Sequence, residues 1–189
     1  FNIPNVSIEA IESPALTRIG WLRSVSNIQH AFAIGSMVDE IATYRKTDPV
    51  KNLLELLGPD RMIPLNEYIK GFENYGEPLE KFPADTSRLR KVIELVAEKS
   101  GWGKELPKGH GMGICAHKSF LTYVACVVHV VFDDNGKMTI PEAHYAVDCG
   151  QVVNLNSVIQ QFEGGLVFAL SGAMKGSISF KDGRSEQTN

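Results

Sequence analysis

The stretch SFLTYVACVVHVVFDDNGKMTIPEAHYAVD, residues 119–148, decides the fold of this chain. Its first part, 119–132, is rich in valine, tyrosine and phenylalanine, which favour β-strands. Residues 133–136 end in Asn-Gly and predict a tight turn, because Asn-Gly tolerates the positive φ angles of a type I′ turn. Residues 137–148 are then expected to return as a second strand. The stretch therefore predicts a long antiparallel ribbon.

Helices are predicted on both sides of this ribbon, where apolar residues recur at helical spacing. Three of them carry a start signal. Asp48 stands before a proline, Asp85 precedes Thr86, and Asn154 precedes the last helix, and each is a favourable N-cap arrangement. The predicted helices cover about 28–43, 49–57, 87–100 and 155–174.

The remaining segments are shorter or less regular. Alternating apolar and polar residues predict a strand at 5–12, and loops are predicted at 14–20 and 102–113. Residues 59–83 carry too many apolar side chains for a disordered linker and are expected to wrap the surface with a helical turn or two. A small hairpin is expected around Asp182-Gly183. The fold class is α+β, an antiparallel sheet with helices packed on it, in one domain over 1–189 with a sub-boundary near 103–113.

The composition is that of an ordinary globular protein. The 189 residues are 43% hydrophobic and 22% charged, enough for one domain with a core or two small ones. A net charge of −3 gives no basic footprint for nucleic acid or an anionic membrane, and nucleic acid is not an expected partner. The longest apolar runs are too short to span a bilayer. The start at Phe1, without signal-peptide features, predicts an internal piece of a longer polypeptide and leaves the compartment open.

The cysteines and histidines do not predict a metal site. Three cysteines without C-x-x-C spacing argue against a disulfide scaffold, an iron–sulfur cluster or a zinc knuckle, and they are expected to act as small buried hydrophobes. A zinc site made of His110, Cys115 and His117 would match no standard ligand spacing. No metal ligands are therefore expected.

Two places in the chain are candidates for ligand binding. Arg23 is expected in a turn before a helix among apolar neighbours, where a guanidinium suits a carboxylate or another polar ligand. Gln160 and Gln161 precede a glycine pair within the last predicted helix, and glycines are tolerated there when a backbone or a ligand comes close. The alternative is tight helix–sheet packing with solvated glutamines. Similarly, Asp148 lies at the end of a predicted strand. It is either a ligand position or part of a simple turn that also contains a buried Cys149.

Several motifs follow one another in a fixed order along nearly the whole chain: Trp21-Leu22-Arg23-Ser24-Val25, Asp39-Glu40-Ile41-Ala42, Arg88-Leu89-Arg90, Ala97-Glu98-Lys99-Ser100-Gly101-Trp102-Gly103, Ala146-Val147-Asp148-Cys149-Gly150, Val153-Asn154, Gln161-Phe162-Glu163-Gly164-Gly165 and Phe180-Lys181-Asp182-Gly183-Arg184. Together they resemble the molybdopterin-binding large subunit of the xanthine dehydrogenase/aldehyde oxidase family. The closest branch is that of isoquinoline 1-oxidoreductase beta subunits and bacterial aldehyde dehydrogenases. The resemblance implies the α+β fold of that molybdopterin-binding domain.

The resemblance also implies an activity and a site. The full-length enzyme would oxidise aldehydes or N-heterocycles with water as the oxygen donor, and would carry molybdopterin in its cytosine dinucleotide form. A small [2Fe–2S] subunit would be its partner. Arg23 would match the active-site arginine, Val25 would lie beside it in the substrate pocket, and Gln161 would hydrogen-bond the pterin, with Gln160 supplying nearby backbone.

The chain departs from the family pattern at Ser26, Leu155 and Gly35, which replace a glycine, a proline and a glutamate. It also lacks the glycine-rich loop expected upstream and the Gly-x-Gly-Glu-Pro segment that bears the catalytic glutamate. The isolated chain is therefore expected to be inactive, to hold no cofactor alone, and to self-associate through an apolar patch that the missing segments would cover. The alternative is a non-catalytic α+β binding or assembly domain of the same ancestry.

Overall fold

The computed structural model describes residues 1–14 and 19–187, and the chain divides into two compact units, Phe1–Cys149 and Gly150–Asn189. Residues 15–18, which belong to the loop predicted at 14–20, and residues 188–189 lie outside the described residues. Whether the chain behaves as the single domain predicted over 1–189, with a sub-boundary near 103–113, stays a prediction.

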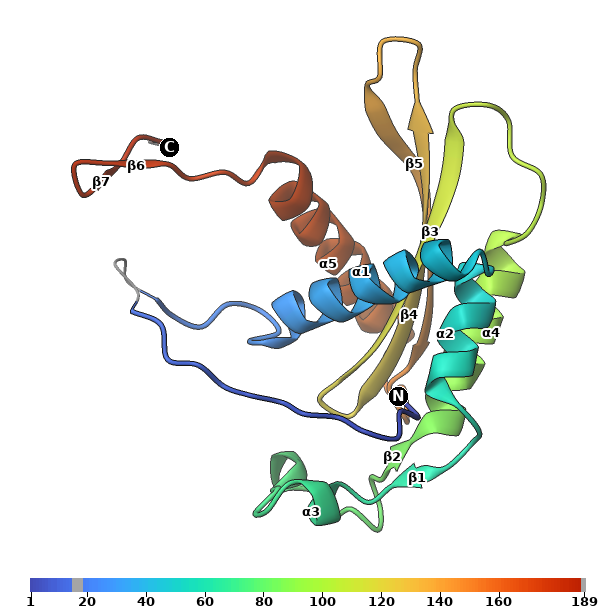
Figure 1. The fold of residues 1–189 in the computed structure, drawn as a ribbon, viewed down its shortest axis with the longest axis vertical. Helices are drawn as coiled ribbons and strands as arrows, with labels where there is room; N and C mark the ends of the chain where they lie inside the picture. Colours follow the sequence, from blue (N-terminus) through green and yellow to red (C-terminus); the bar gives the residue numbers. More distant parts are fainter. Residues whose placement is uncertain (15–18, 188–189) are drawn as a thin grey trace. The chain divides into compact units, whose positions relative to one another are not determined.

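The larger unit is built on a three-stranded antiparallel sheet of order β3-β4-β5. Its strands are β3 (His110–Ser119), β4 (Thr122–Phe132) and β5 (Met138–Asp148), as Figure 1 shows. The predicted ribbon of 119–132 and 137–148 is confirmed as the pair β4 and β5. Its neighbour β3 begins within residues predicted to be a loop. Because two glycines occupy the first four positions of β3, composition favours a loop until the partner strand supplies the hydrogen bonds.

The turn between β4 and β5 differs from the predicted type I′ turn. Gly136 has a φ of 76°, and its N–H donates to the Asp133 carbonyl, while the Asp133 N–H donates to the Lys137 carbonyl. The Asp133 carboxylate also accepts hydrogen bonds from the N–H groups of Asn135 and Lys137. This pattern is that of a type I turn followed by a left-handed glycine, and the Asp133 side chain favours it by satisfying two backbone donors.

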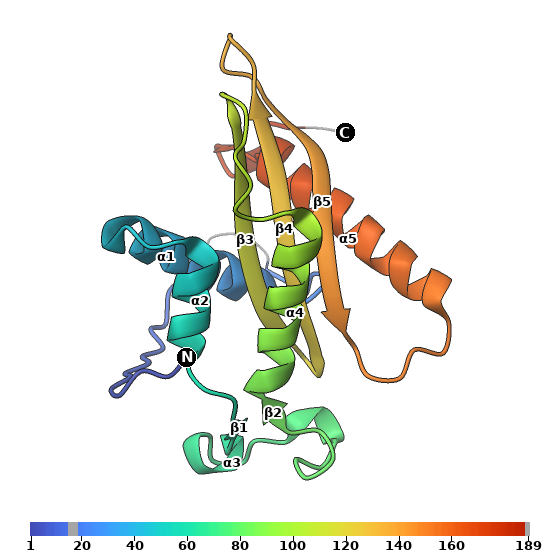
Figure 2. The same ribbon diagram turned by 90° about the vertical axis from the view of Figure 1, so that its right-hand side faces the viewer.

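One face of the sheet packs against α4 (Thr86–Ser100) to form the core. On β4 the alternate residues Tyr123, Ala125 and Val127 are buried on this face, and Ile93 and Val96 of α4 are buried opposite them. Figure 2 shows α4 lying along the sheet, with α2 (Pro49–Leu57) beside it near β3. The period-2 burial of β4 is that of a strand with one fully covered face.

The helix α1 (Asn27–Arg45) lies against β3 and α2. The close packing of α1 on β3 depends on Gly35, because an added Cβ at this position would lie 2.6 Å from the Sγ of Cys115 on β3. A second contact is buried Asn52 of α2, whose amide donates to the Val38 carbonyl and whose oxygen accepts from Arg45. The predicted helices at 28–43, 49–57 and 87–100 are thus found, and Asp48 and Asp85 accept the N-cap hydrogen bonds predicted for them.

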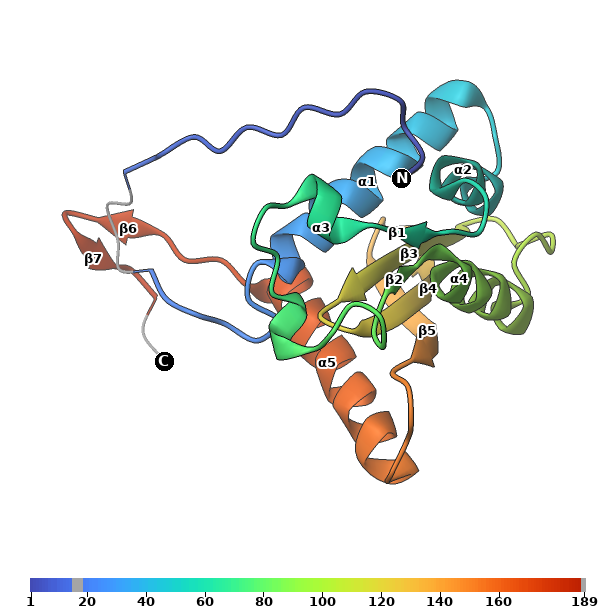
Figure 3. The ribbon, with the colours of Figure 1, turned by 90° about the horizontal axis from the view of Figure 1, so that it is seen from below.

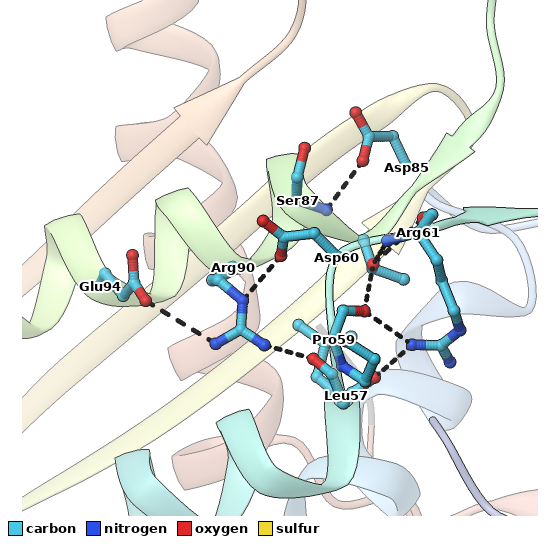
Figure 4. Close-up of polar contacts among 10 residues, drawn as sticks. Leu57, Pro59, Asp60, Arg61, Asp85, Ser87, Arg90 and Glu94 are labelled. Atoms are coloured by element: carbon cyan, nitrogen blue, oxygen red, sulfur yellow. Dashed lines mark hydrogen bonds and ion pairs between the residues drawn. The ribbon is translucent and has the colours of Figure 1, made fainter.

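A pair of arginines holds the segment between α2 and α4 in place (Figure 4). Arg90 of α4 pairs with Asp60 and Glu94 and donates to the Gly58 carbonyl, and Arg61 donates to the carbonyls of Leu57 and Pro59. After this segment come β1 (Met62–Ile63), α3 (Leu65–Tyr68), the 3-10 turn η1 (Asn74–Gly76) and β2 (Ala84–Asp85), the last paired with β1. These short elements fit the predicted surface path of 59–83.

The predicted strand at 5–12 is wrong. These residues carry no strand assignment and their side chains are exposed. The Asn2 N–H donates to the Leu56 carbonyl, which fixes the start of the chain on α2, but no described residue pairs with 5–12. An alternating pattern becomes a strand only when another strand accepts its backbone hydrogen bonds.

The smaller unit consists of α5 (Leu155–Lys175) and the hairpin of β6 (Phe180–Lys181) and β7 (Arg184–Ser185), which Figure 3 shows from below. The Asn154 side chain caps α5 by accepting from the Ser157 N–H at 2.9 Å. At the hairpin, Asp182 and Gly183 have φ angles of 50° and 75°, as a type I′ turn requires. Among the described residues, none of the helices has the length and apolar character needed to cross a membrane. The predicted α+β class is confirmed.

Candidate functional site

Arg23 lies in a tight turn that leads directly into α1. The Val25 N–H donates to the Leu22 carbonyl at 2.9 Å, and the Asn27 N–H donates to the Ser24 carbonyl at 3.0 Å. The side chain of Asn27 adds a third hydrogen bond to the Ser24 carbonyl at 3.1 Å. Arg23 is exposed within this turn.

The backbone at this turn is strained. Ser24 and Val25 have φ angles of 68° and 53°, and a β-branched residue such as valine rarely takes a left-handed conformation. Backbone strain of this kind costs on the order of 1–3 kcal/mol and is often found at functional sites. Val25 also lines an open cavity of about 460 Å³ together with Trp21, Leu22 and Ile28. The structure therefore places Val25 at a cavity that Arg23 adjoins in sequence.

The α5 helix presents Gln160 and Gln161 in its exposed first half. Gly164 lies one helical turn after Gln161 and so shares its face. A Cβ added at Gly164 would meet no heavy atom of the described chain within 4 Å. Within the described part of the smaller unit, therefore, no packing contact requires a glycine at this position, and the alternative of tight helix–sheet packing stays open. The open space leaves the Gln161 amide beside a bare stretch of helix backbone.

Arg23 and Val25 belong to the larger unit, and Gln160 and Gln161 belong to the smaller one. Their convergence on one cavity stays a prediction. The structure describes each candidate by itself, a strained turn that carries Arg23 and an exposed helix that carries Gln160 and Gln161.

The sequence left open whether Asp148 is a ligand position or part of a turn. In the structure Asp148 has a defined structural role. Its carboxylate accepts two parallel hydrogen bonds from Arg88, from Nε and from Nη2, both at 2.6 Å. This pair joins the end of β5 to the first turn of α4, 60 residues apart. Because Arg88 was noticed only as part of a motif, sequence reasoning missed this contact. No local signal predicts it, since the pairing depends on the register of the sheet.

The same ion pair extends to a buried tyrosine. The Arg88 guanidinium carbon lies 4.5 Å from the centre of the Tyr123 ring, and the Tyr123 hydroxyl donates to the Pro83 carbonyl and accepts from the Asp85 N–H. Burial raises the pKa of Tyr123, and the hydrogen bond to Asp148 raises the pKa of Arg88. Burial, followed by repulsion from Arg88, lowers the pKa of Lys118. These groups therefore form a structural network that joins the end of β5 and the start of β4 to the first turn of α4.

The opposite face of the sheet carries two cysteines and a histidine. Cys115 and Cys126 are direct partners across β3 and β4, and both are reduced and half-buried. Burial raises the pKa of the Cys115 thiol and raises the pKa of Cys126 to about 11. His117 Nε2 lies 2.9 Å from the Asn27 Oδ1 at the start of α1, and burial lowers the pKa of His117. All three cysteines, Cys149 included, are free but only partly buried, so the predicted full burial is not found.

Comparison with known proteins gives a family and three relatives. Residues 80–189 match the molybdopterin cofactor-binding domain family. The chain is 32% identical over 161 residues to a membrane-bound aldehyde dehydrogenase (pyrroloquinoline-quinone) of Gluconacetobacter polyoxogenes, covering 82% of the chain and 19% of the relative. It is 24% identical over 193 residues to the beta subunit of an isoquinoline 1-oxidoreductase of Brevundimonas diminuta, covering 100% of the chain and 21% of the relative.

A third relative, one of the subunits of a nicotinate dehydrogenase of Pseudomonas putida, is 24% identical over 172 residues, which cover 88% of the chain and 13% of the relative. The chain therefore spans about a fifth or less of the length of these relatives. No solved structure matches the chain. The matched family region contains α4, the three long strands and α5, so Gln160 and Gln161 lie inside it and Arg23 and Val25 lie before it.

Proposed function

We propose, from the premise that this chain belongs to the molybdopterin cofactor-binding domain family, that it forms part of a molybdenum-dependent oxidoreductase acting on aldehydes or N-heterocycles. The relatives support this proposal, because their names are those of an aldehyde dehydrogenase, an isoquinoline oxidoreductase and a nicotinate dehydrogenase. The name of the first relative refers to pyrroloquinoline quinone, a different organic cofactor, whereas the matched family binds a pterin.

The observation that carries the proposal is the arrangement around Gln161. A pterin has a fused ring edge with several donors and acceptors, and a carboxamide offers both kinds of group. Gly164 leaves open space on the same face of α5, so a planar ring system can approach the helix backbone there. The residues present therefore fit the cofactor. Gln161 would bind the cofactor through its side chain, and Gln160 would bind it through its backbone. The cofactor would be the cytosine dinucleotide form of molybdopterin.

When bound, the molybdenum cofactor supplies the redox chemistry that transfers an oxygen atom from water to the substrate. The residues of this chain would orient the substrate. Arg23 would position the substrate by a charge-assisted hydrogen bond to its oxygen or ring nitrogen, and Val25 would form part of the apolar wall beside it. A substrate of this class is small and mostly apolar, which suits the apolar lining of the cavity at Val25.

The proposal also includes a partner. Two relatives are named as subunits, and electrons released by substrate oxidation need an acceptor. A small [2Fe–2S] subunit would fill that role. The catalytic base and the remaining pocket walls would come from other parts of the protein, so the isolated chain would be inactive.

A pair of glutamine variants tests cofactor binding. In the protein that carries this chain, Gln161→Ala removes the proposed side-chain hydrogen bonds, which is expected to weaken cofactor binding by about 2- to 10-fold for each bond lost, since a neutral hydrogen bond contributes about 0.5–1.5 kcal/mol. Bound molybdenum and pterin are expected to fall accordingly. Gln160→Ala is the matched control, because its proposed role uses only the backbone. Equal cofactor content in both variants would refute the assignment of Gln161.

A pair of glycine variants tests the open space. Gly164→Ala and Gly172→Ala both lie in α5 with no described heavy atom within 4 Å of the added Cβ, so both are expected to favour the helix by about 1 kcal/mol. Only Gly164→Ala is expected to lower molybdenum content, because only Gly164 adjoins the proposed pterin site. If the cofactor content of both variants equals that of the wild type, the non-catalytic alternative gains support.

A further inference from the structure

Two side chains connect the turn that carries Arg23 to the central sheet. His117 lies on β3, on the sheet face opposite α4, and Asn27 is the first residue of α1, which Figure 1 shows crossing the sheet beside β3. The His117 Nε2 lies 2.9 Å from the Asn27 Oδ1, although the two residues are 90 positions apart in the sequence. The Asn27 Nδ2 donates in turn to the Ser24 carbonyl at 3.1 Å.

The chemistry of the acceptors fixes the direction of these two hydrogen bonds. A backbone carbonyl can only accept, so the nitrogen of the Asn27 amide must face Ser24 and its oxygen must face His117. The imidazole then donates from Nε2, which defines its tautomer. Burial, followed by repulsion from His30, lowers the pKa of His117 and so favours this neutral donor form at neutral pH. The imidazole therefore holds the amide in the orientation that binds the turn.

The turn needs support of this kind. Ser24 and Val25 both have left-handed backbone conformations, and strained residues persist only where the surrounding structure holds them. The Ser24 carbonyl accepts from the backbone N–H of Asn27 at 3.0 Å as well as from its side chain. Because Ser24 is exposed, packing does little to hold it. Loss of the side-chain hydrogen bond would let the turn relax and would shift Arg23, the residue before Ser24.

From these contacts we propose that His117 and Asn27 are positioning residues for Arg23. His117 orients the amide of Asn27, and that amide holds the strained turn. The turn in turn keeps Arg23 next to Val25, which lines the open cavity. Groups that bind a substrate are held in a productive geometry by neighbours whose own conformations are fixed by hydrogen bonds. The inference rests on the proposed role of Arg23 in positioning the substrate.

Variants of His117 in the protein that carries this chain test the proposal. Rates are measured per bound molybdenum, with whichever of acetaldehyde, isoquinoline or nicotinate the wild type oxidises fastest. His117→Leu removes the donor to Asn27 and is expected to lower kcat/KM by about 2- to 10-fold, the effect of one neutral hydrogen bond. His117→Gln keeps a side-chain N–H donor and is expected to restore most of this loss. His129→Leu is the matched control with wild-type kcat/KM, because His129 is a half-buried histidine of the same sheet whose ring meets that of His110.

An Arg23→Ala background separates positioning from general stability. The turn then carries no guanidinium, so His117→Leu is expected to cause a smaller loss of kcat/KM there than in the wild type. Equal losses in the two backgrounds would overturn the proposal, as would wild-type kcat/KM in His117→Leu or an equal loss in His117→Gln. If Arg23→Ala itself has wild-type kcat/KM, or if the wild type oxidises none of the three substrates, the proposed function fails and the positioning role fails with it.

Hydrogen exchange of the same proteins follows the turn without a catalytic readout. Asn27→Asp keeps the oxygen that accepts from His117 but loses the N–H donor to the Ser24 carbonyl. Asn27→Asp and His117→Leu are both expected to speed amide exchange in a peptide covering 22–27 by about 2- to 10-fold, whereas His129→Leu is not. Exchange at the wild-type rate in both would overturn the proposal and would leave the proposed function standing.

Discussion

Replacing Gly35 by alanine is predicted to destabilise the larger unit although alanine is the better helix former. Gly35 lies in the middle of α1, where alanine would be favoured by about 0.8–1.0 kcal/mol on intrinsic propensity. The added Cβ would lie 2.6 Å from the Cys115 Sγ and 3.5 Å from its Cβ. The first contact is far closer than van der Waals separation and the second is ordinary. The sulfur atom alone therefore opposes the substitution.

The two effects have opposite signs and can be weighed. Forcing an extra methyl group into a packed contact typically costs about 1–3 kcal/mol, so the net loss for Gly35→Ala is expected to be about 0–2 kcal/mol after the gain in helix propensity. In a Cys115→Ala background the sulfur is gone. The same Gly35→Ala change is then expected to stabilise the protein by up to about 1 kcal/mol. The specific prediction is that Gly35→Ala becomes more favourable by about 1–3 kcal/mol in the Cys115→Ala background, because the propensity gain is the same in both backgrounds and only the steric cost is removed.

Urea unfolding of the four proteins of this double-mutant cycle provides the measurement, with the free energy of unfolding compared at a common slope. Gly172→Ala serves as the control for propensity alone, because its added Cβ would meet no described heavy atom within 4 Å. The reasoning is refuted if Gly35→Ala is as stabilising as Gly172→Ala in the wild-type background. It is equally refuted if Cys115→Ala leaves the effect of Gly35→Ala unchanged.

Three further predictions concern the polar contacts of the larger unit. Arg88→Lys keeps the charge but cannot form the two parallel hydrogen bonds to Asp148, so a loss of about 1 kcal/mol is expected in urea unfolding, and a wild-type midpoint would contradict the assigned role. The lowered pKa of His117 means that the unfolded chain binds its proton more readily, so the stability from His117 is present above pH 6.5 and is lost as the pH falls below that value; His117→Gln should flatten thermal stability between about pH 7 and pH 5 relative to the wild type. With its pKa raised to about 11, Cys126 should be alkylated at about pH 8 roughly 100-fold more slowly in the native protein than in urea, and similar rates in mass spectrometry would argue against burial of that thiol.

Local signals in the sequence were enough for the helices. Asp48, Asp85 and Asn154 each accept the cap hydrogen bond that their position predicts, because capping involves only neighbouring residues. The β4–β5 hairpin was found for the same reason. Its turn type was not, since the Asp133 side chain binds two backbone N–H groups and favours a type I turn over the type I′ turn expected of Asn-Gly.

Features that depend on distant residues could not be predicted in this way. The strand β3 has a weak pattern of its own and is defined by its pairing with β4, whereas residues 5–12 have a strand-like pattern and no described partner. Arg88 and Asp148 meet only because the sheet brings the end of β5 to the first turn of α4. At the candidate site, local patterns pointed to Arg23, Gln160 and Gln161, whereas the resemblance supplied Val25 and the specific roles of all four residues, and these roles stay predictions.

Gly35, in the middle of α1, is linked to the turn of Arg23, which lies just before the start of the same helix. The helix is held on β3 through Gly35 and Cys115, and at its first residue through Asn27 and His117. The turn of Arg23 is hydrogen-bonded to that same first residue, because Asn27 donates to the Ser24 carbonyl from both its backbone and its side chain. A bulkier residue at position 35 would move the helix away from β3, and the strained turn would move with it. The glycine and the cysteine opposite it are therefore expected to act as one unit in placing Arg23.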